Sequence, residues 1–429
     1  MSDGDRGQDE SFALTDFALD RVDVSLTGSV SNRVAALRSG DLGSLPAILA
    51  IGVLVAIFGA VNPSSFLTLL NLANFLEQAS GVIVIAMAVS FTLLLGEIDL
   101  AAGFTAGVSA AVLATRLQEW SLIPSVLVSA LVAILLGTFT GYMVAKVGIP
   151  SFVVTLANVL LFQGILLLLV RDGGSVRISD PYVNGLVGGT LSPVVSWLAA
   201  GLGLVVYGWV VLRKQRSSHG VIPISVVALK LVGTAVVVVI VTALLNRNRA
   251  FARAPEPIAG LPTVVPVIVV ILFLLTLLLT RTRYGRHLFA VGGNAEAARR
   301  AGINVAMLKL SAFAMCGLLA GIGGAFLASR VNSVDPNTGA NDTLLLAVGA
   351  AVIGGTSLFG GHGRMINAVL GGFVLALIPN GLTLVGKQAL PLLGEIDFGS
   401  SGIKFICAGL ALLIASSVDA LSRNQGSIA

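Results

Sequence analysis

Charged residues are scarce in this chain. Asp, Glu, Lys and Arg make up 11% of its 429 residues, whereas soluble domains contain about 25%. Hydrophobic residues make up 56%, so the composition excludes a large soluble domain and indicates an integral membrane protein. The small excess of basic over acidic residues, 26 against 21, fits the bias of basic residues towards the cytoplasmic side of membranes. It does not indicate a nucleic-acid partner.

Cysteine is also scarce, and metal-ligand clusters and nucleotide-binding loops are missing. Cys316 and Cys407 are the two cysteines, both in apolar runs, so there is no disulfide framework. The three histidines are scattered, and no His, Cys and Asp spacing suggests a metal. Residues 381–388 approach the G-x-x-x-x-G-K-[ST] pattern, but Gln388 stands where a hydroxyl would bind magnesium. We therefore expect no cofactor in this chain and no nucleotide hydrolysis by it.

Apolar runs dominate what is present. A membrane-spanning helix needs about 20 mostly apolar residues. We predict an all-α polytopic membrane protein with about twelve transmembrane helices (ten to twelve), some broken or re-entrant because several runs are short. The predicted spans are 45–61, 79–96, 100–115, 122–146, 151–170, 191–212, 225–245, 263–280, 308–329, 343–360, 366–386 and 402–418.

The domain organisation follows from these spans. Residues 1–44 carry charges throughout and lack the apolar core of a signal peptide, so they are predicted to form a cytoplasmic N-terminal tail. Residues 45–420 form the transmembrane domain, and residues 421–429 form a cytoplasmic C-terminal tail. The positive-inside rule sets this orientation, because the reverse would place the basic loop 281–309 outside.

Two interruptions divide the apolar runs, one in each half of the chain. Glu97 and Asp99 mark the first, and the glycine-rich residues 353–361 mark the second. Interrupted segments in corresponding halves often mark the working region of a transporter. Because a carboxylate within hydrocarbon is costly unless it is partnered or hydrated, two interpretations stay open. Glu97 and Asp99 either shape a pathway or hold a bend between spans, or they lie solvated in a short cytoplasmic loop.

Three amides lie inside predicted spans. Asn158 and Gln163 belong to the span 151–170, and Asn380 follows Pro379 in the span 366–386. Neutral amides in lipid usually face the bundle interior. Asn158 and Gln163 either bond neighbouring helices or bind the hydroxyls of a polar solute. Asn380 either satisfies a backbone carbonyl freed by the proline or lines a pore.

The stretch 281–309 is the most polar part of the membrane domain. It holds six basic residues against the single acid Glu296, and this surplus of five equals the net charge of the whole chain. Within it, Asn294 is suited to cap a short helix over Ala295–Ala301, with Gly302 just beyond its end. Two turns of helix are marginal alone. The helix either docks on a cytoplasmic partner or belongs to a solvated basic loop near anionic lipid.

Several motifs in order resemble permease subunits of bacterial ATP-binding-cassette sugar importers. GGNAEAARRAGIN at 292–304 is similar to their cytoplasmic loop, and GEIDL at 96–100 resembles their G-x-I-D-L segment. PSFVVTL at 150–156 and VIGGTSL at 352–358 look most like the xylose-type branch. Ala101-Ala102-Gly103 and Gln163 depart from the usual Ser-Val-Gly and Arg, which leaves the solute open.

The resemblance implies a set of partners and roles. Two permease chains would form the pore in the bacterial cytoplasmic membrane, an extracytoplasmic binding protein would deliver the sugar, and cytoplasmic ATPase subunits would bind ATP and magnesium. The loop at 292–304 would transmit ATPase closure to the spans. The residues so assigned to ATPase coupling are Gly293, Asn294, Glu296, Ala297, Arg299, Arg300 and Gly302.

Other functions stay open at this stage. Within the same family, the solute could be xylose or a related pentose, ribose, galactose, a branched-chain amino acid or a nucleoside. An ion-coupled secondary transporter is an alternative, although such proteins usually carry charges inside the membrane for coupling. A receptor or scaffold without transport has no soluble sensor domain in this sequence to support it.

Overall fold

The chain is described here from a computed structural model, which covers residues 44–171, 174–217, 224–250, 257–390 and 394–426. Residues 1–43, almost all of the predicted N-terminal tail, lie outside the described residues.

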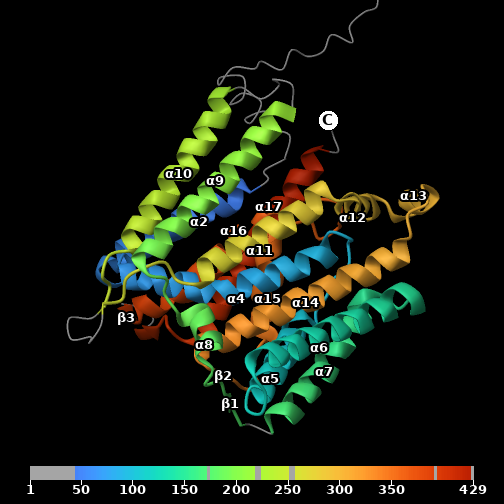
Figure 1. The fold of residues 1–429 in the computed structure, drawn as a ribbon, viewed down its shortest axis with the longest axis horizontal. Helices are drawn as coiled ribbons and strands as arrows, with labels where there is room; N and C mark the ends of the chain where they lie inside the picture. Colours follow the sequence, from blue (N-terminus) through green and yellow to red (C-terminus); the bar gives the residue numbers. More distant parts are fainter. Residues whose placement is uncertain (1–43, 172–173, 218–223, 251–256, 391–393, 427–429) are drawn as a thin grey trace, which may run out of the picture.

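Helices joined by short turns make up nearly all of the described chain (Figure 1). They are α2 (Leu45–Val61), α3 (Pro63–Phe66), α4 (Leu69–Leu93), α5 (Ala102–Arg116), α6 (Leu122–Tyr142), the π-helical turn η1 (Met143–Val147), α7 (Ser151–Val170), α8 (Pro181–Gly188), α9 (Pro193–Ser217), α10 (Ile224–Leu245), α11 (Val264–Arg281), α12 (Arg283–Gly293), α13 (Ala295–Arg300), α14 (Val305–Val331), α15 (Asn341–Ile353), α16 (Met365–Val385) and α17 (Ser401–Gly426). Two short antiparallel strand pairs join them, β1 (Val176–Arg177) with β2 (Ser333–Val334), and β3 (Lys387–Leu390) with β4 (Gly394–Asp397). The predicted all-α polytopic class is confirmed.

Each of the twelve predicted spans contains a helix, but the helices differ in length. Among the described residues, eight helices are long and apolar enough to cross a membrane, and α2, α15 and α17 contain shorter apolar stretches. The helix α5 has 15 residues, most of them buried, and α15 has 13. Both fall short of the ~20 residues of a full span, as the interruptions in the sequence predict.

Three boundaries differ from the predicted ones for identifiable reasons. The helix α4 begins at Leu69 and not near 79, because polar residues in its first turns, among them Asn71 and Glu77, lower the apolar signal. The helix α15 ends at Ile353, where the left-handed Gly355 (φ 102°) stops it. The helix α17 continues to Gly426, into the predicted C-terminal tail.

The helix α14 lies at the centre of the bundle, packed between α4 and α6 (Figure 1). Glycine permits its close crossing with α6. A Cβ atom on Gly317 would lie 2.3 Å from the carbonyl oxygen of Ala133, and one on Gly137 would lie 2.3 Å from that of Phe313. Since apolar side chains gain little by leaving lipid for another helix, such close backbone packing is a main source of attraction between membrane helices.

The helices α9 and α10 pack against each other and stand apart from the rest of the bundle in Figure 1. Only 6% of each apolar stretch is buried. Large apolar side chains such as Leu198, Leu202 and Val205 are about two-thirds exposed. We assign these faces to lipid, which exacts no hydrophobic cost for such exposure.

Candidate functional site

The helix α13 is short and capped at both ends. It spans Ala295–Arg300, one residue less than predicted, and the Oδ1 atom of Asn294 accepts a hydrogen bond from the N–H of Ala297 (2.9 Å). Gly302 follows in the left-handed conformation, with φ of 83°, which glycine adopts without steric cost. The predicted capped helix is therefore confirmed, whereas its docking role remains a prediction.

One face of the segment formed by α12 and α13 is buried and the other is open. Leu288, Val291 and Ala298 are at most 4% exposed and join the main hydrophobic core. The residues assigned to ATPase coupling, by contrast, are all exposed: Gly293, Asn294, Glu296, Ala297, Arg299, Arg300 and Gly302. The buried face fixes the segment to the bundle, and the open face is accessible to a partner.

The charges of α13 pair mainly with each other. Glu296 accepts hydrogen bonds from Arg299 (3.0 Å) and Arg300 (3.2 Å). All three side chains are more than half exposed, so each ion pair contributes on the order of 0.2–1 kcal/mol. These pairs stiffen the helix surface, and they add little to its attachment to the bundle.

The turn between α4 and α5, residues 94–101, is held by α14 and α7. The Glu97 carboxylate forms an ion pair with the Lys309 ammonium, near the start of α14. The N–H of Ile98 donates to Ser151 Oγ (3.4 Å), and the carbonyl of Ile98 accepts from Thr155 Oγ1 (3.3 Å). The turn is thus tied to two helices that are distant in sequence.

Asp99 is buried inside this arrangement, with only 3% of it exposed. Its carboxylate accepts hydrogen bonds from the N–H of Ala101 (2.9 Å) and from the thiol of Cys316 on α14 (3.4 Å). A buried carboxylate needs such partners. Both carboxylates therefore have partners within the protein, which favours the interpretation that they hold the bend between α4 and α5. A direct part in transport stays a prediction.

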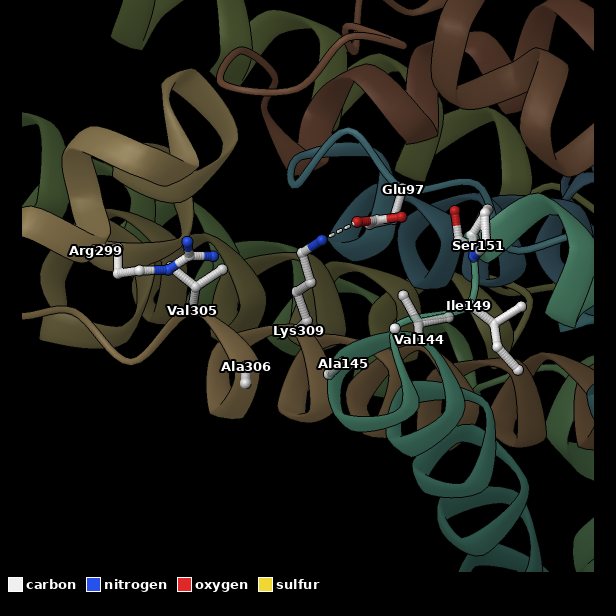
Figure 2. Close-up of a pocket in the computed structure, with 11 residues that line it drawn as sticks. Glu97, Val144, Ala145, Ile149, Ser151, Arg299, Val305, Ala306 and Lys309 are labelled. Carbon is white, nitrogen blue, oxygen red and sulfur yellow. Dashed lines mark hydrogen bonds and ion pairs between the residues drawn. The ribbon is translucent and has the colours of Figure 1, made fainter.

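A cleft of about 320 Å³ opens between this turn and α13. Its walls come from the turn (Glu97), the start of α7 (Ser151), α13 (Arg299) and the first turns of α14 (Lys309). Figure 2 shows the Lys309 side chain reaching Glu97. Nothing in the sequence marks Lys309 and Ser151 as partners of the turn. Their contacts cross 212 and 53 residues, which no local pattern reveals.

The three amides predicted inside spans do not form one cluster. Asn158 on α7 donates to Thr140 Oγ1 on α6 (2.9 Å). Asn380 on α16 donates to Asn71 Oδ1 on α4 (3.0 Å), and Asn71 donates in return to Asn380 Oδ1 (3.3 Å). Gln163 is half-buried on α7. Asn158 and Asn380 therefore bond neighbouring helices. The three amides do not come together as one polar site for a solute.

Arg249 is a basic residue buried in the loop that follows α10. It is 7% exposed, and its guanidinium donates to the carbonyls of Leu245 (2.7 Å) and Gly260 (2.8 Å). Burial lowers the pKa of Arg249, and the nearby Glu77 carboxylate opposes that shift. The side chain therefore bonds the last residue of α10 and connects it to the loop that follows.

The fold and the site define a class of protein: a polytopic helical membrane protein with interrupted helices and a capped helix presented on one side. The comparisons give the family. The profile of the family described as branched-chain amino acid transport system / permease component matches residues 71–396. The chain belongs to this permease family.

Relatives with sugar-transport names match along most of the chain. The xylose transport system permease protein XylH of Escherichia coli (strain K12) is 32% identical over 413 residues, 94% of this chain and 98% of the relative. XylH of Haemophilus influenzae is 33% identical, covering 81% of this chain and 92% of the relative. The ribose import permease protein RbsC of Bacillus subtilis (strain 168) is 28% identical, covering 89% and 94%. No solved structure matches the chain at a significant level.

These matches confirm the resemblance to sugar-importer permeases that the motifs indicated. The family and the apolar helices also make the chain a multi-pass membrane permease component.

Proposed function

We propose that this chain is the membrane-spanning subunit of an ATP-driven importer that moves a monosaccharide, xylose or a related pentose, into a bacterial cell. The full-length similarity to two xylose permeases, at 32% and 33% identity, carries the choice of solute. The open face of α13 and its flanking residues, where all seven assigned coupling residues are exposed, supports the choice of energy source.

The proposal includes partners that supply what this chain lacks. A cytoplasmic ATPase subunit binds ATP and magnesium and docks on α13. An extracytoplasmic binding protein selects the sugar, and a second copy of this chain completes the pore. The chain lies in the bacterial cytoplasmic membrane, and both of its termini are in the cytoplasm.

Uptake of labelled sugar by proteoliposomes tests this function. The chain is reconstituted with its ATPase and binding protein, and labelled xylose and ribose are compared with ATP inside. We expect xylose uptake that requires the ATPase, the binding protein and ATP together. Faster uptake of ribose than of xylose would change the assigned solute to ribose, and the proposed energy source would stand.

A gradient experiment separates the alternative class. The same vesicles without ATPase are given an inward proton or sodium gradient. We expect no accumulation. Gradient-driven accumulation by this chain alone would overturn the proposal and favour an ion-coupled transporter.

A further inference from the structure

Three segments that are far apart in sequence meet in direct backbone contact at the C-terminal end of α4. They are the end of α12, the turn after α4 and the loop after α15. The N–H of Gly361 donates to the carbonyl oxygen of Leu94 (2.9 Å). A Cβ atom on Gly292 would lie 1.8 Å from that same oxygen and 2.6 Å from the nitrogen of Gly361. Only a glycine at 292 permits this approach.

A second contact closes the triangle. Gly360 is left-handed (φ 87°), and a Cβ atom there would lie 2.7 Å from the carbonyl oxygen of Gly292 and 2.8 Å from the nitrogen of Gly96. Gly96 is itself left-handed, with φ of 75°. We call Leu94, Gly96, Gly292, Gly360 and Gly361 the glycine junction.

The ion pair between Glu97 and Lys309 joins the same parts at a separate place. Glu97 lies one residue beyond Gly96, and Lys309 lies in the second turn of α14, immediately after α13. The turn after α4 is therefore fastened to the chain on both sides of α13: before it, by the glycine junction at the end of α12, and after it, by this pair at the start of α14.

We propose that the glycine junction and the Glu97–Lys309 pair form the rigid connection that carries movement of α12 and α13 to both interrupted helices, α5 and α15. This inference rests on the proposed function, since it assigns the inner side of the ATPase-driven input. Backbone atoms in contact have no side-chain rotamers that could absorb a displacement. Close-packed interiors transmit strain for that reason.

The proposed connection has two branches, one that leads to α5 and one that leads to α15. Movement of Gly292 presses on the Leu94 carbonyl, which leads into α5, and on Gly360 and Gly361, which follow α15. Both interruptions recognised in the sequence therefore share one mechanical input, and α5 and α15 are expected to move together. The contacts form a continuous series of packed backbone atoms between the two sites, and packed networks of this kind can carry coupling.

Glycine substitutions with matched controls test the junction in the reconstituted importer. Gly292→Ala is compared with Gly52→Ala, a helical glycine with no atom within 4 Å of its Cβ position. Gly360→Ala is compared with Gly386→Ala, which is also left-handed (φ 65°) but has open space around it. The readouts are ATPase association, ATP hydrolysis and xylose molecules imported per ATP hydrolysed.

We expect both junction variants to bind the ATPase and hydrolyse ATP while importing at least about fivefold less sugar per ATP, the lower end of typical coupling effects. The two controls keep the wild-type ratio. A wild-type ratio in assembled Gly292→Ala and Gly360→Ala complexes would overturn the inference.

A charge exchange tests the Glu97–Lys309 pair of the proposed connection, and it remains informative if the glycine variants fail to fold. Glu97→Lys and Lys309→Glu each place like charges together, and the double exchange restores an attractive pair. We expect each single variant to lose uptake per ATP and the double variant to regain most of it. Equal import by all four forms, or single losses without rescue, would overturn the role of the pair.

The readouts keep this inference separate from the proposed function. If the wild-type chain recruits no ATPase, the proposed function fails. If the wild type imports with ATP and the variants import equally well per ATP, the function stands and the junction is not the connection.

Discussion

Amide side chains at helix contacts show how this bundle handles polar groups. Asn71 and Asn380 exchange two hydrogen bonds between α4 and α16, and Asn380 also donates to Gln78 Oε1 (3.4 Å). Asn380 follows the helical Pro379, yet its partners belong to another helix. The bond is therefore a contact between helices rather than a repair of the proline site.

A double-mutant cycle tests that account. The variants Asn71→Ala, Asn380→Ala and their combination are compared by unfolding in mixed micelles. Interhelical hydrogen bonds in membrane proteins contribute about 0.6–2 kcal/mol, so we expect a coupling energy in that range. A coupling energy of zero, together with a changed KM for sugar in Asn380→Ala, would instead show that Asn380 lines the pore.

At the scale of the element, α13 depends on its ends more than on its length. Six residues cannot hold a helix alone, and its ion pairs are exposed. The cap at Asn294, the left-handed Gly302 and the buried Ala298 determine where it ends and which face it shows. A change at Gly302 should therefore alter presentation of the helix without affecting insertion of the chain.

Gly302→Val and Gly302→Asn provide the corresponding comparison. Valine is strongly disfavoured at positive φ, whereas asparagine tolerates it. A Cβ atom at this position meets nothing within 4 Å, so the difference between the variants reports backbone conformation alone. We expect the valine variant to insert normally and to import much less sugar per ATP than the asparagine variant. Equal import by the two variants would argue against a role for the shape of α13.

At the scale of the whole molecule, α13 and β3 lie at opposite ends of the helix bundle (Figure 1), and we predict that they face opposite sides of the membrane. Cysteine labelling in intact cells tests this orientation. Gln388→Cys is expected to react with an impermeant maleimide in intact cells, and His287→Cys only after the cells are permeabilised. Of the two native cysteines, Cys316 is buried and is left in place, and Cys407 is replaced by serine so that it does not react with the maleimide. The reverse pattern would invert the topology.

Much of the fold could be predicted from the sequence because membrane spans and caps are local signals. Apolar runs located the helices, and Asn294 with Gly302 located α13. The contacts of the glycine junction could not be predicted, because Leu94, Gly292 and Gly361 meet only through tertiary packing. Likewise, the sequence showed Glu97 and Lys309 as separate charges, and the structure alone pairs them across 212 residues.

The central claim is that this chain is driven through α13 by a separate ATPase, and site-specific protection tests it most directly. Ala297→Cys, on the open face, is labelled with a maleimide in the purified chain with and without its ATPase, and Gln388→Cys serves as the control. We predict that the ATPase blocks labelling at position 297 and leaves position 388 unchanged. Unchanged labelling of position 297 in the assembled complex would contradict the account.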